Sequence, residues 1–215
     1  MGTNVFLFVP NILGYIRIVL LLLACCFMKN NCEITLLTYI ISCLLDAVDG
    51  HAARSLNQST KFGAMLDMIV DRCSTMCLLG CLIYFYPSYM FFFQLSMVID
   101  IASHWLHLHS SILSGSSSHK VIDLKSNPFL RLYYTNKVVL FLMCAGNELF
   151  YTMLYIAHFY PGPKLFSFGL SNVLACVTAP IAILKMSISL IQLHAACVNM
   201  VSVDKKKELR FSRSN

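Results

Sequence analysis

Residues 44–72 read LLDAVDGHAARSLNQSTKFGAMLDMIVDR and concentrate four aspartates and two arginines in one short part of the chain. The carboxylates come as two pairs, spaced three and four residues apart: Asp46 with Asp49, and Asp67 with Asp71. On a helix these spacings put both members of a pair on one face. Gly50 and Gly63 bound the connection between the pairs. We therefore predict two antiparallel helices whose four carboxylates converge about one helical turn from that connection.

The composition places this hairpin in a membrane. Of 215 residues, 58% are hydrophobic and only 12% are charged, whereas about a quarter are charged in soluble domains. A helix needs about 20 apolar residues to cross a bilayer, so the sequence predicts an all-α integral membrane protein. We expect a single transmembrane domain over 1–200 and a basic cytosolic tail over 201–215. About six transmembrane helices are expected, near 5–28, 34–49, 63–86, 89–109, 134–159 and 168–200.

The basic residues are unevenly divided between the two sides that six spans would create, and this division predicts the orientation. The side that holds only Lys29 and Lys164 is expected to face away from the cytosol. Both termini and the connection between the aspartate pairs are then cytosolic. The net charge of +6 suits an anionic lipid leaflet rather than a nucleic acid. The cytosolic set is Arg54, Lys61, Lys120, Lys125, Arg131, Lys205, Lys206, Lys207, Arg210 and Arg213.

The four carboxylates need positive charge around them. One carboxylate in a membrane span costs roughly 2.5–3.5 kcal/mol, and carboxylates that converge also repel one another. Divalent cations remove this cost, and an all-oxygen donor set suits Mg²⁺, Mn²⁺ or Ca²⁺ rather than zinc or copper. Two ions about 4 Å apart would match the arrangement used for displacement at phosphorus. A second interpretation is simple ion pairing, with partners among Arg17, Arg54, Lys61 and Arg72.

The stretch resembles, at every fixed position, the signature of the CDP-alcohol phosphotransferase family, which in this chain reads Asp46-x2-Asp49-Gly50-x2-Ala53-Arg54-x8-Gly63-x3-Asp67-x3-Asp71. Chance agreement of its eight residues has odds on the order of one in ten billion per starting position. Three further stretches are similar to the eukaryotic phosphatidylinositol synthases, a branch of that family: FLFVPNILGYIRIV, SHWLHLHSS and CAGNELFY. The resemblance implies transfer of a phosphatidyl group from CDP-diacylglycerol to myo-inositol, with CMP released.

The resemblance also implies a role for each signature residue. Asp71 corresponds to the proton acceptor, within reach of a metal, and the metal ligands are Asp46, Asp49, Asp67 and Asp71, holding Mg²⁺ or Mn²⁺, with two ions expected. Gly50 lets the nucleotide approach the backbone, Arg54 grips phosphate oxygens, and Thr60 is a further contact to CDP-diacylglycerol. The implied site lies at the cytosolic ends of the first three helices. An endoplasmic reticulum location and a homodimer follow from the same resemblance.

A second polar face lies in the predicted fourth span. Asp100, His104 and His107 follow at i, i+4 and i+7, and this face offers the donors and acceptors that myo-inositol needs. Hydrogen bonds to neighbouring helices are the alternative explanation. Arg17, in the first span, has two interpretations of its own, because it could reach a diphosphate or pair with an aspartate.

Two other functions fit parts of the pattern. A relative enzyme could use another acceptor, such as glycerol phosphate, serine, choline or ethanolamine. A divalent-cation transporter could use the same carboxylates, but the far ends of the two spans read LLTYIISC and CLLGCLIY and offer no polar path across the bilayer.

The predicted orientation can be tested at Asn57, which begins the only N-x-S/T sequence in the chain, Asn57-Gln58-Ser59. A cytosolic connection carries no glycan, so we expect no mass change when the protein from eukaryotic membranes is treated with a glycosidase. A glycan on Asn57 would reverse the predicted orientation.

Overall fold

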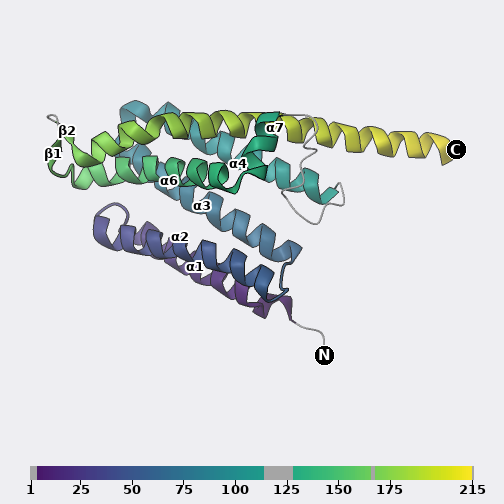
Figure 1. Cartoon of the computed structure of the whole chain (residues 1–215), viewed down its shortest axis with the longest axis horizontal. Coiled ribbons are helices and arrows are strands. Elements are labelled where there is room, and N and C mark those ends of the chain that lie inside the picture. Colours follow the sequence, from purple (N-terminus) through teal and green to yellow (C-terminus); the bar gives the residue numbers. More distant parts are fainter. Residues whose placement is uncertain (1–3, 114–127, 166–167, 215) are drawn as a thin grey trace. The chain divides into compact units, whose positions relative to one another are not determined.

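The computed structural model describes residues 4–113, 128–165 and 168–214 (Figure 1). The described chain is almost wholly helical, as predicted. Its helices are α1 (Val9–Phe27), α2 (Cys32–Ser55), α3 (Lys61–Phe85), α4 (Met90–Leu113), α5 (Pro128–Thr135), α6 (Lys137–Phe159) and α7 (Leu170–Ser214), with 3-10 turns η1 (Val5–Leu7) and η2 (Pro87–Tyr89). Two short strands before α7, β1 (Lys164–Leu165) and β2 (Phe168–Gly169), pair in antiparallel fashion and were not predicted.

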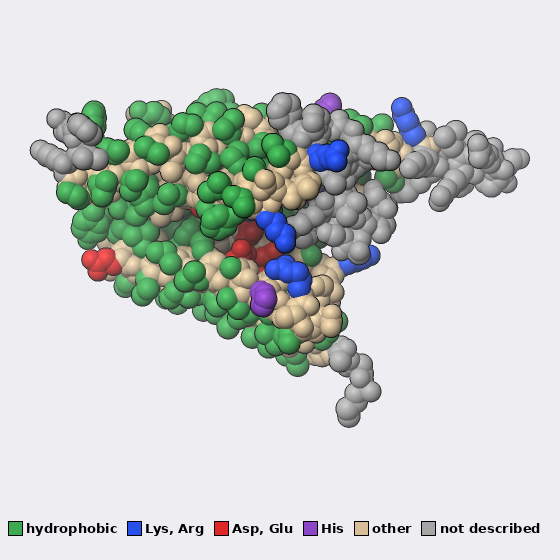
Figure 2. All heavy atoms as spheres, in the orientation of Figure 1, with side chains coloured by type: hydrophobic (Ala, Val, Ile, Leu, Met, Phe, Trp, Pro, Cys, Tyr) green, Lys and Arg blue, Asp and Glu red, His purple; other side chains and the backbone are tan. Residues whose placement is uncertain are grey.

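Four described helices are long and apolar enough to cross a membrane: α1, α3, α6 and the Leu170–Lys205 part of α7. Together with α2 and α4 they cover the six predicted segments, so the all-α membrane class is confirmed. The number of spans stays a prediction. Figure 2 shows hydrophobic side chains over most of the visible surface of the described residues, as expected of a protein that faces lipid.

The chain divides into two compact units. The first contains residues 1–90 and 158–160, and the second contains 91–157 and 161–215. The single transmembrane domain over 1–200 therefore stays a prediction, and each unit is described by itself below.

In the first unit α1, α2 and α3 lie side by side (Figure 1). The protein-facing stripe of α1 recurs every three or four residues and contains Asn11, Gly14, Arg17, Leu21 and Ala24, all buried. Small residues on this stripe allow close packing, since a Cβ at Gly14 would lie only 2.8 Å from the Leu66 side chain of α3. Arg17 thus points into the protein rather than into lipid.

The connection between α2 and α3 is shorter than predicted. We expected it to run from Gly50 to Gly63, but α2 continues to Ser55 and α3 begins at Lys61. The α2 helix ends where Asn57 takes a positive φ of 52°, a conformation that asparagine tolerates better than most residues. Thr60 then caps α3, because its Oγ1 accepts a hydrogen bond from the Gly63 N–H at 3.0 Å. The whole signature therefore occupies two helices and five connecting residues.

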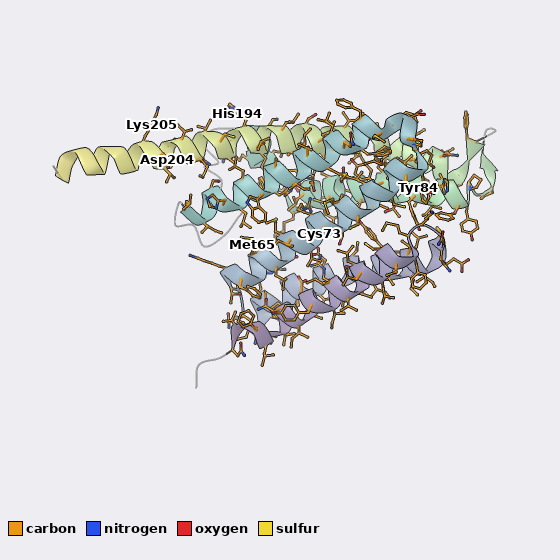
Figure 3. The ribbon with its side chains drawn as sticks, turned by 180° about the vertical axis from the view of Figure 1, so that it is seen from behind. Met65, Cys73, Tyr84, His194, Asp204 and Lys205 are labelled. Atoms are coloured by element: carbon orange, nitrogen blue, oxygen red, sulfur yellow. The ribbon has the colours of Figure 1, made fainter. Side chains whose placement is uncertain are left out.

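In the second unit α6 packs closely against α7. A Cβ at Gly146 would lie 2.7 Å from Ile181 Cγ2, so this contact depends on a glycine. The α7 helix contains Pro180 and continues beyond the predicted end of the last span at residue 200, past His194, Asp204 and Lys205 (Figure 3). The predicted tail over 201–215 is therefore an extension of a helix as far as Ser214. Two lysines used for the predicted orientation, Lys120 and Lys125, lie outside the described residues.

Candidate active site

The two aspartate pairs converge in the first unit, as predicted. One carboxylate oxygen from each of Asp46, Asp49 and Asp67 lies within 4.8 Å of the other two. Asp49 is almost fully buried, whereas the side chains of Asp46 and Asp67 are 43% and 41% exposed. A dissolved ion or a charged substrate can therefore reach the cluster at Asp46 and Asp67, whereas the cluster is closed to solvent at Asp49.

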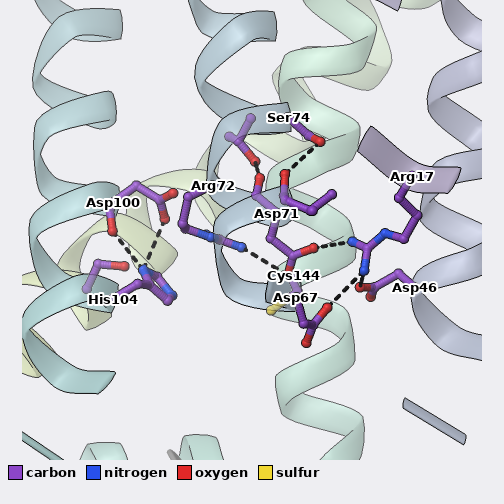
Figure 4. A network of polar contacts seen from close by, with 12 residues as sticks. Arg17, Asp46, Asp67, Asp71, Arg72, Ser74, Asp100, His104 and Cys144 are labelled. Atoms are coloured by element: carbon purple, nitrogen blue, oxygen red, sulfur yellow. Dashed lines mark hydrogen bonds and ion pairs between the residues drawn. The ribbon is translucent and has the colours of Figure 1, made fainter. Parts of the chain in front are cut away.

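Arg17 of α1 joins all four carboxylates, and Figure 4 shows it beside Asp46, Asp67 and Asp71. Its Nη1 lies 2.7 Å from Asp46 Oδ1, 2.9 Å from Asp49 Oδ2 and 2.8 Å from Asp67 Oδ1, and its Nη2 contacts Asp71 Oδ1. The Arg17 side chain is only 3% exposed. Of the two interpretations of Arg17, pairing with an aspartate is the one seen, and a single arginine serves both pairs at once.

Arg72 supplies a second, more distant positive charge. Its Nη2 lies 3.6 Å from Asp71 Oδ2, on the side of that carboxylate that Arg17 does not contact. The backbone carbonyl of Asp71 accepts a hydrogen bond from Thr75 Oγ1, and one turn of α3 is further held by Ser74 Oγ, which donates to the carbonyl of Val70 (Figure 4). Asp71 is thus held on a regular helix, with an arginine at each oxygen.

The remaining signature residues line the ends of α2 and α3. A Cβ at Gly50 would lie 3.5 Å from Arg54 Nη1, so the Arg54 side chain folds back over the bare face of Gly50 one turn earlier. The Oγ1 of Thr60 is engaged in the cap of α3. Gly63 allows a closer approach, since a Cβ there would lie 2.9 Å from Asn11 Oδ1.

Asn11 is a buried polar residue beside the signature that the sequence did not single out. Its Nδ2 donates to the carbonyl of Val5 at 2.6 Å, while its Oδ1 has no hydrogen-bond partner among the described residues. The available signal was an asparagine directly after Pro10 in an apolar span.

The acidic cluster fits a divalent cation. The donors are carboxylate oxygens only, they come close together, and two of the three side chains are open to solvent. This donor set is the one that Mg²⁺ and Mn²⁺ prefer. Asp46, Asp49 and Asp67 would hold the ion, while Asp71 is bound to the same guanidinium.

The predicted polar face of α4 is present in the second unit. His104 Nδ1 lies 2.8 Å from the carbonyl of Asp100 and 3.4 Å from its Oδ1. His107 is buried and stacks on Tyr134 with ring centroids 6.0 Å apart. Both histidines thus have contacts within their own unit, so the alternative of structural hydrogen bonding accounts for part of this face.

The second unit also has a buried polar stripe on α7. Lys185, Ser189 and Gln192 follow at i, i+4 and i+7, and each is at most 5% exposed. Lys185 Nζ donates to Ser189 Oγ at 3.2 Å, whereas neither polar atom of the Gln192 side chain has a hydrogen-bond partner among the described residues. A buried glutamine without partners is costly, and the sequence alone did not draw attention to it.

Comparison with known families gives a match to the part of the chain that contains the site. The model of the CDP-alcohol phosphatidyltransferase family matches residues 7–160, which include the acidic cluster and Arg17. No solved structure matches the chain.

Three known proteins similar to this chain share the name CDP-diacylglycerol–inositol 3-phosphatidyltransferase. The protein of that name from Homo sapiens is 58% identical over 202 residues, which cover 94% of both chains. The one from Drosophila melanogaster is 53% identical over 201 residues, covering 94% of this chain and 88% of the relative. The one from Schizosaccharomyces pombe is 43% identical over 217 residues, covering 94% and 92%.

Loss of one carboxylate from the cluster should weaken cation binding. We expect Asp67→Asn to lower the affinity of the purified protein for Mn²⁺, measured by electron paramagnetic resonance, by at least about tenfold. Even residues that only hydrogen-bond to the ligands of a metal site lower metal affinity by about that factor when they are replaced. Glu33→Gln is the matched control, because Glu33 is an exposed acid in the first turn of α2, at the opposite end of that helix. Equal Mn²⁺ affinity in both variants would remove Asp67 from the site.

Proposed function

This chain belongs to the CDP-alcohol phosphatidyltransferase family, and on that basis we propose that it transfers the phosphatidyl group of CDP-diacylglycerol to myo-inositol. The products are phosphatidylinositol and CMP. The observation that carries the proposal is the convergence of Asp46, Asp49 and Asp67 within 4.8 Å of one another, beside Asp71. The shared name of relatives 53–58% identical to the chain supports inositol as the acceptor.

The reaction is a displacement at the phosphorus atom that carries the diacylglycerol. A hydroxyl oxygen of inositol forms a new bond to this phosphorus, the bond to the bridging oxygen of the diphosphate breaks, and CMP leaves with the electron pair. Asp71 takes the hydroxyl proton, as the family resemblance implies. Its position next to Asp67 on α3 suits this role, because a base must lie close to the reacting centre.

Asp46, Asp49, Asp67 and Asp71 would hold Mg²⁺ or Mn²⁺, with two ions expected from the four carboxylates. When bound, such ions neutralise the diphosphate and make its phosphorus more open to attack. Arg54 would bind phosphate oxygens, and Gly50, which the Arg54 side chain covers, would leave room for the nucleotide. Thr60 would add a contact while it caps α3.

The acceptor needs a polar surface of its own, and the second unit offers one. Asp100, His104 and His107 on α4 are proposed to bind inositol hydroxyl groups, which act as both donors and acceptors. The buried stripe of α7 supports this proposal, because Gln192 keeps a donor and an acceptor unused. Both helices belong to one unit and touch at Ser96 Oγ and Met186 Sδ, 3.8 Å apart.

The proposed cellular setting follows from the substrates. One substrate is a membrane lipid and the other is a dissolved polyol, so the reaction needs a site at a membrane boundary. We propose the endoplasmic reticulum membrane, with both termini and the α2–α3 connection in the cytosol. A homodimer is also proposed, from the family resemblance alone.

The acceptor is tested directly in washed membranes that contain the protein. With labelled CDP-diacylglycerol we expect lipid product only when myo-inositol is added, and none with glycerol phosphate, serine, choline or ethanolamine. EDTA should abolish the product, and Mg²⁺ or Mn²⁺ in excess should restore it. Equal product without inositol would overturn the proposed acceptor but leave the family membership intact.

The role of Asp71 has its own test. Asp71→Asn keeps the shape of the side chain but cannot take up the hydroxyl proton, so we expect turnover to fall by at least about a hundredfold. The control is Asp204→Asn, at an exposed position on α7. Both variants should accumulate in membranes to similar levels, as judged by immunoblot, and near-normal turnover in Asp71→Asn would exclude Asp71 as the base.

A further inference from the structure

Arg17 occupies the position that a cation needs. Its Nη1 lies within 2.9 Å of an oxygen from each of Asp46, Asp49 and Asp67, the same three residues whose oxygens cluster closely enough to ligate a metal. A guanidinium and a divalent ion cannot share these oxygens, because their charges would repel strongly at such short separation. The observed contacts and metal binding therefore exclude each other.

The net charge of the site is compatible with replacement of Arg17 by a divalent ion. Four carboxylates face the positive charges of Arg17 and Arg72, so two negative charges remain uncompensated. One divalent ion would cancel them. Two ions would leave the site positive by two charges, which equals the negative charge of a diphosphate diester. Arg17 would then be the cation that has given up its carboxylates, and the diphosphate would be the anion that needs a counter-charge.

We propose that Arg17 is a resident counter-ion of the acidic cluster that changes partners during loading. It holds Asp46, Asp49, Asp67 and Asp71 together before a divalent ion binds, gives up these carboxylates to the ion, and then binds the substrate's diphosphate. The inference rests on the proposed function, and it adds a positioning role for a residue outside the family signature.

The chemistry of the side chain supports both partners. The planar guanidinium carries N–H donors that match carboxylate and phosphate oxygens alike. Its Nε has no hydrogen-bond partner among the described residues, so one donor is unused in the carboxylate-bound position. The side chain comes from α1, whereas the four carboxylates are on α2 and α3. Arg17 can therefore change partners without moving any proposed ligand.

The experiment compares Arg17→Gln with a control substitution, Lys29→Gln, just beyond the far end of α1. Lys29 is exposed just after α1, with its Nζ 4.9 Å from the centroid of the Tyr84 ring. It lies about 18 Å from Arg17 along the helix axis. Lys29→Gln therefore removes one positive charge from the same part of the chain but not from the cluster. Each purified full-length variant is measured for Mn²⁺ affinity by electron paramagnetic resonance and for binding of CDP.

The proposal predicts shifts of opposite sign. Arg17→Gln should bind Mn²⁺ at least about tenfold more tightly, because the competing charge is gone. At saturating Mn²⁺ it should bind CDP at least about tenfold more weakly, because the diphosphate has lost a partner. Its melting temperature without metal should fall by at least about 4 °C. Added Mn²⁺ should raise the melting temperature of Arg17→Gln by more than it raises that of the wild type. Lys29→Gln should match the wild type in all three measurements.

Other outcomes overturn the proposal. Mn²⁺ affinity that is unchanged or weaker in Arg17→Gln would mean that Arg17 only supports the fold or the metal ligands. If that variant does not fold, Arg17→Lys keeps the charge but loses the planar fork. Its CDP affinity at saturating Mn²⁺ must then fall, and unchanged CDP affinity overturns the proposal.

None of these measurements uses inositol, so the inference and the proposed function can fail separately. If Arg17→Gln binds Mn²⁺ more tightly and CDP more weakly than the wild type, but the wild type transfers nothing to inositol, only the proposed acceptor is contradicted. A wild type that makes phosphatidylinositol, with Mn²⁺ and CDP affinities that Arg17→Gln does not alter, contradicts only the inference.

Discussion

The contact between one guanidinium and four carboxylates is the interaction on which this site depends. The carboxylates come from two helices and the guanidinium from a third, so a single group ties α1 to both α2 and α3. In a membrane protein the alternative for each acid is an uncompensated charge, and removal of one partner from a buried ion pair costs roughly 3–5 kcal/mol. The same arrangement that stabilises the first unit keeps the acids close enough to serve a cation.

Local sequence makes this convergence geometrically possible. The α2–α3 connection is only five residues long, and it ends in a threonine cap that fixes the start of α3. Glycines at two signature positions leave space, one for the Arg54 side chain and one for Asn11. These features hold the acids about one turn or more inside the helices yet leave Asp46 and Asp67 partly exposed. A lipid diphosphate from the membrane and a polyol from water could both reach such a position.

The aspartate spacing was enough to predict the cluster, because a helical period converts separations of three and four residues into a shared face. Spacing could not identify Arg17 as the common partner of Asp46 and Asp71, since it lies on another helix and its partners are decided by packing. The end of α2 was also misplaced, because Gly50 was taken to end a helix that in fact continues to Ser55. Gln192 was missed for a related reason. Lys185, Ser189 and Gln192 do follow a helical spacing, but the sequence does not show that the Gln192 side chain is buried without a hydrogen-bond partner among the described residues, which is what makes it unusual.

We propose that the ends of α2 and α3 pool their carboxylates to hold divalent cations for chemistry on a nucleotide-activated lipid. The most direct measurement is an experimental structure of the protein with Mn²⁺, in which anomalous scattering locates the metal. We predict Mn²⁺ peaks within about 2.5 Å of carboxylate oxygens of Asp46, Asp49 and Asp67, with the Arg17 guanidinium moved away from them. An anomalous map with no peak among these residues at saturating Mn²⁺, and Arg17 still in contact with all four acids, would contradict the account.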